Sequence, residues 1–414
     1  MTIDAQGAES ARIYLDVTST LVTRNITGIP RVVRNLAGHI TTSKIVLVEY
    51  DGLADAYFEV DQNLMSSQYD TATQVEKSSS FIRIYKQFGE IRLVSKIITR
   101  ILRNRYAFYL LRAIIGPKTA TTGKKVSIQN GVLFIPEVPL NQAHVRHIER
   151  MSGQPNIKLA ILLHDLLPLQ YPQYFSDDLV WKFRNFSALL QLSDLTIVTS
   201  QSMKQQFLEL LPEKRVEIVP LPSSFTQYNG EIRRDNFFLM VGTIEPRKNH
   251  ITVLKAFEKF STRDPSARLT IVGARGWKYR KILQELKRLQ KNGLHIEWYE
   301  SVSDNRLLEF YRSARALIFP SFCEGYGLPI LEALSQRTPV ITSDVAVLRD
   351  FARYGGVELV NPIDVEGFVA KMQTLQDSKY AQSLSANIRV DDIPIGWNCT
   401  AQTIFSHLNS LLQP

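Results

Sequence analysis

Two short stretches of the 414-residue chain combine residue types that bind a charged, hydroxyl-rich ligand. The first is IFPSFCEGYGLPILEAL, residues 318–334, with Glu324 in a loop and Glu332 in a segment that Pro329 predicts to begin a helix. A carboxylate accepts two hydrogen bonds from a vicinal diol, each worth about 1.5–3 kcal/mol, so two acids suit a ligand with two diols, such as a sugar nucleotide. A lone helical glutamate is more often solvated or capping.

The loop after Glu324 predicts a cradle for phosphate or sugar hydroxyls. Gly325 and Gly327 remove side chains where a ligand would approach backbone N–H groups, and Tyr326 and Leu328 complete the path into the helix. The start of a helix favours negative charge through its dipole.

The second stretch is LMVGTIEPRKNH, residues 239–250, where a buried strand opens into Gly242 and Thr243 and then into Arg247 and Lys248. It lacks the spacing of a Walker phosphate loop. Adjacent cationic side chains just after a strand predict a pyrophosphate site. The alternative is a basic helix cap, which fits Lys248 alone better than the pair.

Short apolar runs alternate with helical patterns along most of the chain, which indicates βαβ units and parallel sheets. The strands expected in the first half lie near residues 13–15, 45–48, 132–135, 159–163, 195–198 and 216–219, and those in the second half near 237–241, 269–272, 295–298, 316–319, 340–342 and 357–359. We expect an α/β protein with two Rossmann-like, doubly wound domains facing a central cleft. The predicted parts are residues 1–222, a linker at 223–236, residues 237–390, and a segment 391–414 that crosses back to the first domain.

The net charge of +9 is concentrated in one window. Residues 81–125 contain eleven Lys or Arg against Glu90, and part of this insertion has the pattern of a basic amphipathic helix. Such a helix binds an anionic membrane surface or packs on its own domain, and these alternatives are about equally weighted. Nucleic acid is not expected, because aromatic residues do not interleave with the cations.

The composition, with 44% hydrophobic and 21% charged residues, is that of an ordinary globular protein. The amino terminus has no apolar signal core and no stretch approaches 18 apolar residues, so the cytoplasm is the expected compartment. Two cysteines without Cys-x-x-Cys spacing exclude a zinc module.

The order GTIEPRKN, VGARG, VSDNRLLEFYRSARALIFPSFCEGYGLPILEAL and TPVITSD closely resembles the retaining GT-B glycosyltransferases of family four, which include bacterial mannosyltransferases of polysaccharide assembly. The resemblance is strong over about residues 237–375. Glu324 and Glu332 match the family's Glu-x7-Glu motif, and Arg247 and Lys248 match its basic pair. Relatives usually carry glycine where Glu300 and Arg337 stand.

By this resemblance, Arg247 and Lys248 hold the donor diphosphate, Glu324 binds hydroxyls of the donor sugar, and Glu332 binds the ribose. The same resemblance implies donor contacts for Gly242, Thr243, Val302 near the base, and the loop Gly325, Tyr326, Gly327 and Leu328. No cofactor and no metal are implied, since no Asp-x-Asp motif is present.

The first half carries two further matches. LDVTSTLVTRNITGIPRVVRNLAGHI resembles the family's opening strand and glycine loop, which implies that Gly28 lies near the donor phosphates and that Arg31 contacts them. ILLHDLLPL places His164 and Asp165 just after a strand. A lone histidine there is more often structural, but the resemblance implies that His164 touches the donor sugar and that Asp165 orients the sugar or the acceptor.

We therefore expect a retaining, metal-independent hexosyltransferase that uses a nucleotide-diphosphate sugar, with GDP-mannose favoured by resemblance. The expected acceptor is a lipid-linked or growing saccharide in cell-surface polysaccharide biosynthesis, such as lipopolysaccharide O-antigen. The expected location is the cytoplasm, peripheral on the inner face of the membrane. Two alternatives are a sugar-nucleotide epimerase of similar fold and a non-catalytic, nucleotide-sugar-binding membrane scaffold.

Overall fold

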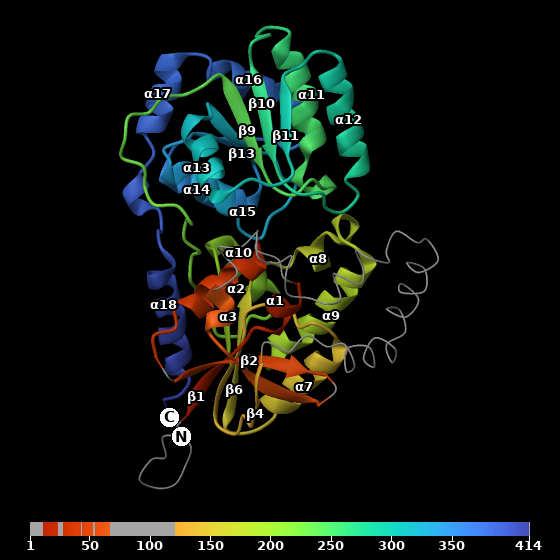
Figure 1. Ribbon diagram of the computed structural model, residues 1–414, viewed down its shortest axis with the longest axis vertical. Coiled ribbons are helices and arrows are strands. Elements are labelled where there is room, and N and C mark those ends of the chain that lie inside the picture. The colour runs from red at the N-terminus through yellow and green to blue at the C-terminus, as the bar shows by residue number, and fades with distance from the viewer. Residues whose placement is uncertain (1–10, 24–27, 43, 53, 67–120, 414) are drawn as a thin grey trace. The chain divides into compact units, whose positions relative to one another are not determined.

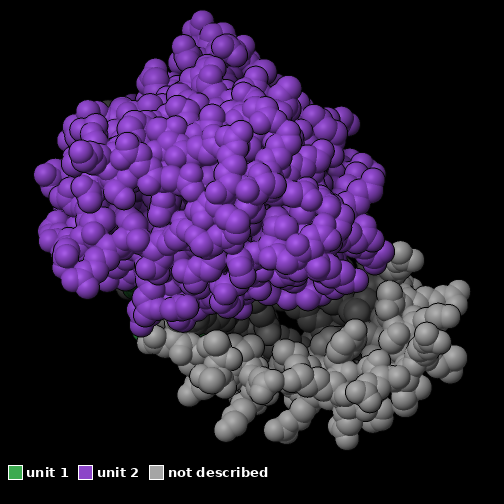
Figure 2. Space-filling model, turned by 90° about the horizontal axis from the view of Figure 1, so that it is seen from above, with its two compact units in different colours: residues 1–158 green, residues 159–414 purple. Residues whose placement is uncertain are grey.

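The computed structural model of the chain describes residues 11–23, 28–42, 44–52, 54–66 and 121–413. Contacts between residues divide the chain into two units, residues 1–158 and 159–414, which are coloured separately in Figure 2. Most of the basic window at 81–125, including the expected amphipathic helix, lies outside the described residues. The predicted domain boundaries at 222, 236 and 390 stay a prediction.

The first unit combines parallel strands and helices with an antiparallel edge formed by β3 and β4 (Figure 1). They are β1 (Arg12–Asp16), α1 (Thr18–Thr23), α2 (Ile29–Gly38), β2 (Ile45–Asp51), β3 (Ala56–Val60), α3 (Asn63–Ser66), β4 (Thr121–Val126), β5 (Gly131–Ile135) and α7 (Gln142–Ser152). β1 pairs in parallel with β2 and β5, whereas β3 pairs antiparallel with β2 and β4.

The second unit begins with the rest of the first strand series. It contains β6 (Ile157–Leu163), which starts at the unit boundary, then α8 (Leu167–Gln170), a 3-10 turn η2 (Pro172–Tyr174), α9 (Asp177–Leu192), β7 (Leu195–Val198), α10 (Gln201–Leu210) and β8 (Val216–Ile218). The strand order of this sheet is β4-β3-β2-β1-β5-β6-β7-β8. Serine caps begin its helices: the Ser176 and Ser200 side chains accept hydrogen bonds from backbone N–H groups of α9 and α10.

The second sheet has six parallel strands in the order β11-β10-β9-β12-β13-β14. Its elements are β9 (Phe237–Val241), η3 (Pro246–Lys248), α11 (His250–Ser261), β10 (Arg268–Val272), α12 (Arg280–Lys291), β11 (Ile296–Tyr299), α13 (Asp304–Ser313), β12 (Ala316–Phe319), α14 (Leu328–Ser335), β13 (Val340–Ser343), α15 (Ala346–Arg349), η4 (Asp350–Tyr354), β14 (Val357–Val360), α16 (Val365–Thr374), α17 (Ser378–Ala386), η5 (Val390–Asp392) and α18 (Trp397–Ser410). Strand order reverses between β9 and β12, where doubly wound sheets bind ligands beyond the carboxyl ends of their strands.

Both faces of this second sheet are covered by buried apolar side chains. One cluster includes Phe238, Phe257 and Leu286, and the other includes Leu239, Phe319 and Leu331. A strand such as β12 is therefore buried along its whole length, as parallel strands between two helix layers are. The prediction of two Rossmann-like α/β sheets is confirmed.

No helix or strand lies between β8 and β9, at the predicted linker. Arg234 nevertheless holds this segment against the second sheet: its guanidinium donates to the carbonyl oxygens of Arg312 at 2.6 Å and Arg337 at 2.7 Å and to Thr338 Oγ1 at 2.9 Å. Burial lowers the pKa of Arg234 to about 10. α18, which starts at Trp397, lies in the predicted terminal segment, and its Thr400 Oγ1 donates to the carbonyl oxygen of Pro220 at 3.2 Å.

Candidate functional site

The turn after β9 positions the basic pair. Gly242 has a φ of 154°, and a Cβ on the neighbouring Gly273 would lie 1.9 Å from the Gly242 carbonyl oxygen, so this close approach requires glycine at 273. Asn249 adopts a left-handed φ of 54°, and its Nδ2 donates to the carbonyl oxygens of Pro320 at 3.0 Å and Pro362 at 2.7 Å. The turn is thereby fixed against the carboxyl end of β12.

The loop after β12 meets this turn directly. The Phe322 backbone N–H donates to the carbonyl oxygen of Arg247 at 2.9 Å, and Gly327, with a φ of 130°, is the N-cap of α14. The helix begins at Leu328, with Pro329 in its first turn, close to the expected start. Because β9 and β12 are neighbours in the sheet, residues 77 positions apart in sequence meet in one site.

Glu324 lies between the two cations. Its Oε2 is 2.8 Å from Arg247 Nη1 and its Oε1 is 2.5 Å from Lys248 Nζ, and these three side chains are only 8–14% exposed. Lys248 Nζ also lies 4.7 Å from the centre of the Phe319 ring. Arg247 makes a second ion pair, with Glu245 Oε1 at 2.8 Å. The site is a buried quartet of two cations and two carboxylates.

Burial alone would raise the pKa of Glu324, but the charges of Lys248 and Arg247 outweigh it and lower that pKa to about 2. Glu324 is therefore an anion at neutral pH. Burial, together with the charge of Lys248, lowers the pKa of His250 to about 3 and keeps that imidazole neutral. Both cations of the site are thus paired with carboxylates, and burial lowers the pKa of Lys248.

His164 and Asp165, which follow β6, lie against the loop that carries Glu324. A Cβ added to Gly325 would be 2.6 Å from the His164 carbonyl oxygen and 2.7 Å from Asp165 Cβ, so only glycine fits at 325. Burial raises the pKa of Asp165 to about 6, against the opposing influence of the Leu167 N–H and the charge of Arg247. The second unit thus brings His164 and Asp165 together with the basic pair.

Glu332 lies within α14, at the position expected for it, and is 3% exposed. Tyr311 in α13 donates a hydrogen bond from its hydroxyl to Glu332 Oε2 at 2.9 Å. Tyr311 thereby orients Glu332, a role that no motif in the sequence indicates. In the loop before α14, the Tyr326 hydroxyl donates a hydrogen bond to the Leu221 carbonyl oxygen at 2.9 Å.

The remaining predicted donor residues lie at ends of strands or helices. Thr243 follows β9 as an exposed residue, and Val302 packs against the core beside α13. In the first unit, Gly28 has a φ of 64° and is the N-cap of α2, and Arg31 lies in the first turn of that helix. The ligand contacts of all these residues stay predictions.

Both positions where relatives usually carry glycine have a structural account. Arg337 adopts a left-handed φ of 58°, the conformation that favours glycine. Glu300 directly follows β11 and pairs with Arg275 at 3.0 Å, and the Arg275 guanidinium lies 5.5 Å from the centre of the Trp298 ring.

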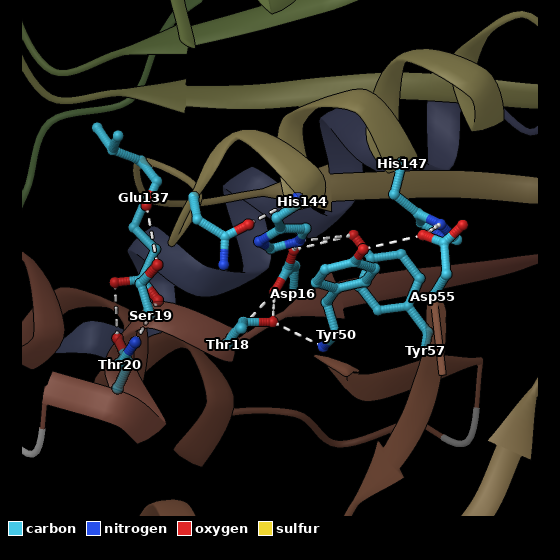
Figure 3. Close-up of polar contacts among 12 residues, drawn as sticks. Asp16, Thr18, Ser19, Thr20, Tyr50, Asp55, Tyr57, Glu137, His144 and His147 are labelled. Atoms are coloured by element: carbon cyan, nitrogen blue, oxygen red, sulfur yellow. Dashed lines mark hydrogen bonds and ion pairs between the residues drawn. The ribbon is translucent and has the colours of Figure 1, made fainter. Parts of the chain in front are cut away.

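A second polar cluster, in the first unit, was not expected from the sequence (Figure 3). Asp16, at the end of β1, accepts from His144 Nε2 at 2.7 Å and from the Tyr57 hydroxyl at 3.0 Å. The Tyr50 ring stacks on the His144 ring, with centres 4.5 Å apart. Burial opposes ionisation of Asp16, but His144 and Thr18 outweigh it and hold its pKa below the usual range.

The same view shows a second buried carboxylate beside the β1–α1 turn. Glu137 Oε1 accepts from the Thr20 backbone N–H at 2.6 Å, and burial raises the pKa of Glu137 to about 8. Ser19 Oγ donates to the Val138 carbonyl oxygen at 2.9 Å. The carboxyl groups of Asp16 and Glu137 thus both accept hydrogen bonds from the chain between β1 and α1.

Comparison with known proteins places this site in a family. Residues 225–391 match the family described as glycosyl transferases group 1, and these residues include every member of the Arg247, Lys248, Glu324 and Glu332 set. Residues 225–391 therefore form a group 1 glycosyl transferase domain. Residues 127–210 match the N-terminal domain described as glucosyltransferase 3-like, which covers His164 and Asp165.

Curated relatives resemble the chain over about half of its length. It is 32% identical over 202 residues to O-antigen chain mannosyltransferase B of Escherichia coli, covering 47% of this chain and 50% of the relative. It is 30% identical over 216 residues to the serotype-specific mannosyltransferase WbdA of Escherichia coli, covering 46% of this chain and 26% of the relative. The chain therefore spans about a quarter to a half of the length of these two relatives.

Solved structures share the fold over nearly the whole chain. A sucrose-phosphate synthase from Thermosynechococcus elongatus superposes with a TM-score of 0.63 at 17% identity, covering 97% of this chain and 99% of the other. This likeness confirms the expected GT-B arrangement of elements, and it concerns the fold alone.

Proposed function

We propose that this group 1 glycosyl transferase is a retaining hexosyltransferase that takes its sugar from a nucleotide-diphosphate donor. The observation that carries the proposal is the buried cluster in which Glu324 lies between Arg247 and Lys248 at 2.5–2.8 Å. A diphosphate is the ligand that two adjacent buried cations bind best, and a carboxylate beside them suits sugar hydroxyls.

The roles follow from this arrangement. Arg247 and Lys248 hold the diphosphate and stabilise the negative charge that grows on the leaving nucleoside diphosphate. Phosphate oxygens compete with Glu324 for both cations, so donor binding weakens the ion pairs of Glu324 and lets its carboxylate accept hydrogen bonds from the sugar. Glu332, oriented by Tyr311, binds the ribose diol.

Other predicted contacts complete the donor site. The loop Gly325, Tyr326, Gly327 and Leu328 offers backbone N–H groups at the start of α14, where the helix dipole favours an anion. His164 contacts the donor sugar and Asp165 orients it or the acceptor. We assign donor binding to residues 237–390 and acceptor binding to residues 1–222, with Gly28 and Arg31 approaching the donor phosphates.

We propose that the anomeric configuration is retained because the acceptor hydroxyl attacks the same face of the sugar from which the phosphate leaves. The acceptor hydroxyl oxygen forms a bond to the anomeric carbon, the bond from that carbon to the phosphate oxygen breaks, and the departing phosphate takes the acceptor proton. Glu324 is a poor candidate for a covalent nucleophile, because two cations hold its pKa at about 2 and lower its basicity.

The donor we propose is GDP-mannose, which the mannosyltransferase names of the relatives support. The acceptor we propose is a lipid-linked or growing saccharide of a cell-surface polysaccharide, met at the inner face of the membrane. Among the described residues, no helix has the length and apolar character to cross a bilayer. Contact with the membrane is therefore proposed to be peripheral.

The test is a donor panel. Purified protein is incubated with GDP-, UDP- and dTDP-sugars, with and without bacterial membrane extract, and free nucleoside diphosphate is measured. Release from one donor that rises with the extract supports a transferase and identifies its donor. Interconversion of the donor sugar without any acceptor would support an epimerase instead, and tight donor binding with no turnover would support a scaffold.

A further inference from the structure

Positive charge is concentrated a second time in the chain, around α12. Residues 275–291 carry seven Lys or Arg against one acid, Glu285. This stretch of 17 residues therefore has a formal charge of +6, while the chain as a whole has +9 and the window at 81–125 already accounts for +10. The remainder of the chain is acidic, so the charge around α12 is a local feature.

The fold turns this charge outward. Ile282, Leu286 and Leu289 are buried in the core beneath the second sheet, where α12 packs beside α11 (Figure 1). The opposite side of the helix carries exposed cations. We call them the α12 basic face: Arg280, Lys281, Lys287 and Lys291. Their spacing keeps all four on one side of a helix about 18 Å long.

The four cations are not neutralised by neighbours. Arg288 forms ion pairs with Glu258 at 2.9 Å and with Glu285 at 2.8 Å, and Arg275 forms one with Glu300 at 3.0 Å. No acidic side chain within the described part of the chain pairs with any member of the α12 basic face. The acids nearest to this helix are thus already engaged, and the face presents uncompensated charge.

An exposed aromatic residue adjoins the face. Trp277, just before α12, is 41% exposed, and Lys278 Nζ lies 5.2 Å from the centre of its ring. Tryptophan beside lysine and arginine is the combination that suits the headgroup region of a bilayer, where the indole ring is partly apolar and its N–H stays hydrated.

We propose that the α12 basic face, with Trp277, binds the surface of an anionic phospholipid membrane. Each cation near such a surface adds to the attraction when screening is low, so four on one face are enough for measurable binding. Nucleic acid fits less well, because a single aromatic residue on a convex helix forms no stacking platform or groove. None of these residues is among the individual donor contacts proposed above, so membrane binding can be measured independently of the proposed transfer reaction.

The experiment measures vesicle binding of the full chain without any donor. Co-sedimentation is followed with vesicles of phosphatidylcholine containing 30% phosphatidylglycerol, and with phosphatidylcholine alone. We expect the quadruple variant R280Q/K281Q/K287Q/K291Q to lose about tenfold or more in partition coefficient on the anionic vesicles. Glutamine keeps a helix propensity close to that of Lys and Arg, so the variant should fold.

A matched variant separates local charge from total charge. K44Q/R146Q/R263Q/K379Q removes the same four charges from exposed positions scattered over both units, and we expect it to bind like the unaltered protein. A third variant, R92Q/K96Q/R100Q/R103Q, measures how much the basic window at residues 81–125 contributes to vesicle binding. An equal loss in the scattered variant, no loss in the α12 variant, or no binding of the unaltered protein to anionic vesicles would each overturn the proposal. Donor turnover is assayed separately, so either proposal can fail alone.

Discussion

Glu324 and Lys248 form the shortest ion pair of the proposed donor site, with Oε1 and Nζ 2.5 Å apart, while the other oxygen of the same carboxylate is 2.8 Å from Arg247. One carboxylate thus pairs with both cations, and Arg247 has Glu245 as a second partner. The pair has two consequences, because the carboxylate stabilises the fold and competes with the donor phosphates for the same cations. Replacing the carboxylate separates the two effects.

Glu324→Gln is expected to abolish sugar transfer while leaving affinity for nucleoside diphosphate within about tenfold, because the lost partner is the sugar. Replacing Glu324 leaves Lys248 without its ion-pair partner and Arg247 with Glu245 alone, which lowers the free energy of unfolding by about 3 kcal/mol. Calorimetric titration with GDP and thermal unfolding check both effects.

Nucleoside diphosphate should raise the melting temperature of Glu324→Gln more than that of the unaltered protein, since the added phosphates restore the missing negative charge. Lys259→Gln is the matched control, because Lys259 pairs with Glu366 on the surface, away from the site. Full transfer activity in Glu324→Gln would remove this carboxylate from the mechanism.

Tyr311→Phe tests whether the hydrogen bond at 2.9 Å orients Glu332 toward the donor ribose. We expect the KM for the donor to rise about fivefold with kcat nearly unchanged, because one hydrogen bond to a charged group contributes to binding and not to the chemical step. Tyr380→Phe is the control, since Tyr380 bonds Glu358 elsewhere in the unit. A fall in kcat at constant KM would contradict a ribose role for Glu332.

His250 predicts acid sensitivity of the second unit. Its pKa in the folded protein is lowered from 6.5 to about 3 by burial and by Lys248, so the unfolded chain takes up the proton first. The stability from keeping this side chain neutral is present above about pH 6.5 and is lost as the pH falls toward 3, by about 5 kcal/mol in total. Urea unfolding at pH 7, 5 and 4 measures the slope.

His250→Asn removes the titrating group and should flatten that slope. Glu324 adds its own loss only at lower pH, because its folded pKa of about 2 and its ordinary value of 4.5 set a window below about pH 4.5. Identical pH slopes for His250→Asn and the unaltered protein between pH 6.5 and 5 would show that His250 is not the group responsible.

Arg337 should tolerate replacement by glycine better than by alanine. Both changes remove the bond from Arg337 Nε to the Tyr228 carbonyl oxygen, at 3.3 Å, but only glycine relieves the φ of 58°. We expect Arg337→Gly to be more stable than Arg337→Ala by about 1 kcal/mol in urea unfolding. Equal stabilities would mean that the backbone at this position carries no strain.

The sequence predicts strand positions of this fold well wherever the pattern is local. The expected ranges for β7, β9 and β12 agree with the structure at both ends, because a short apolar run followed by a turn residue has few alternative structures. β3 and β4 were missed. They are antiparallel additions beside β2, and β3, AYFEV, carries neither strict alternation nor a continuous apolar run.

The sequence predicts those residues of the candidate site that lie in local motifs. Arg247, Lys248 and Glu324 were recognised from local stretches, and the reversal of strand order between β9 and β12 brings them together. Glu245, which shares Arg247, and Tyr311, which orients Glu332, were missed, because each is a single side chain with no spacing signal. The Asp16–His144 pair joins residues 128 positions apart, which no local pattern indicates.

The most direct test of a retaining hexosyltransferase follows the sugar itself. Radiolabelled GDP-mannose is incubated with the protein and bacterial membrane extract, and label in the lipid-extractable fraction is treated with α- or β-mannosidase. We predict label that depends on Glu324 and that only the α-specific enzyme releases, because the donor is an α-linked sugar and its configuration is kept. Release by the β-specific enzyme, or equal labelling by Glu324→Gln, would contradict the account.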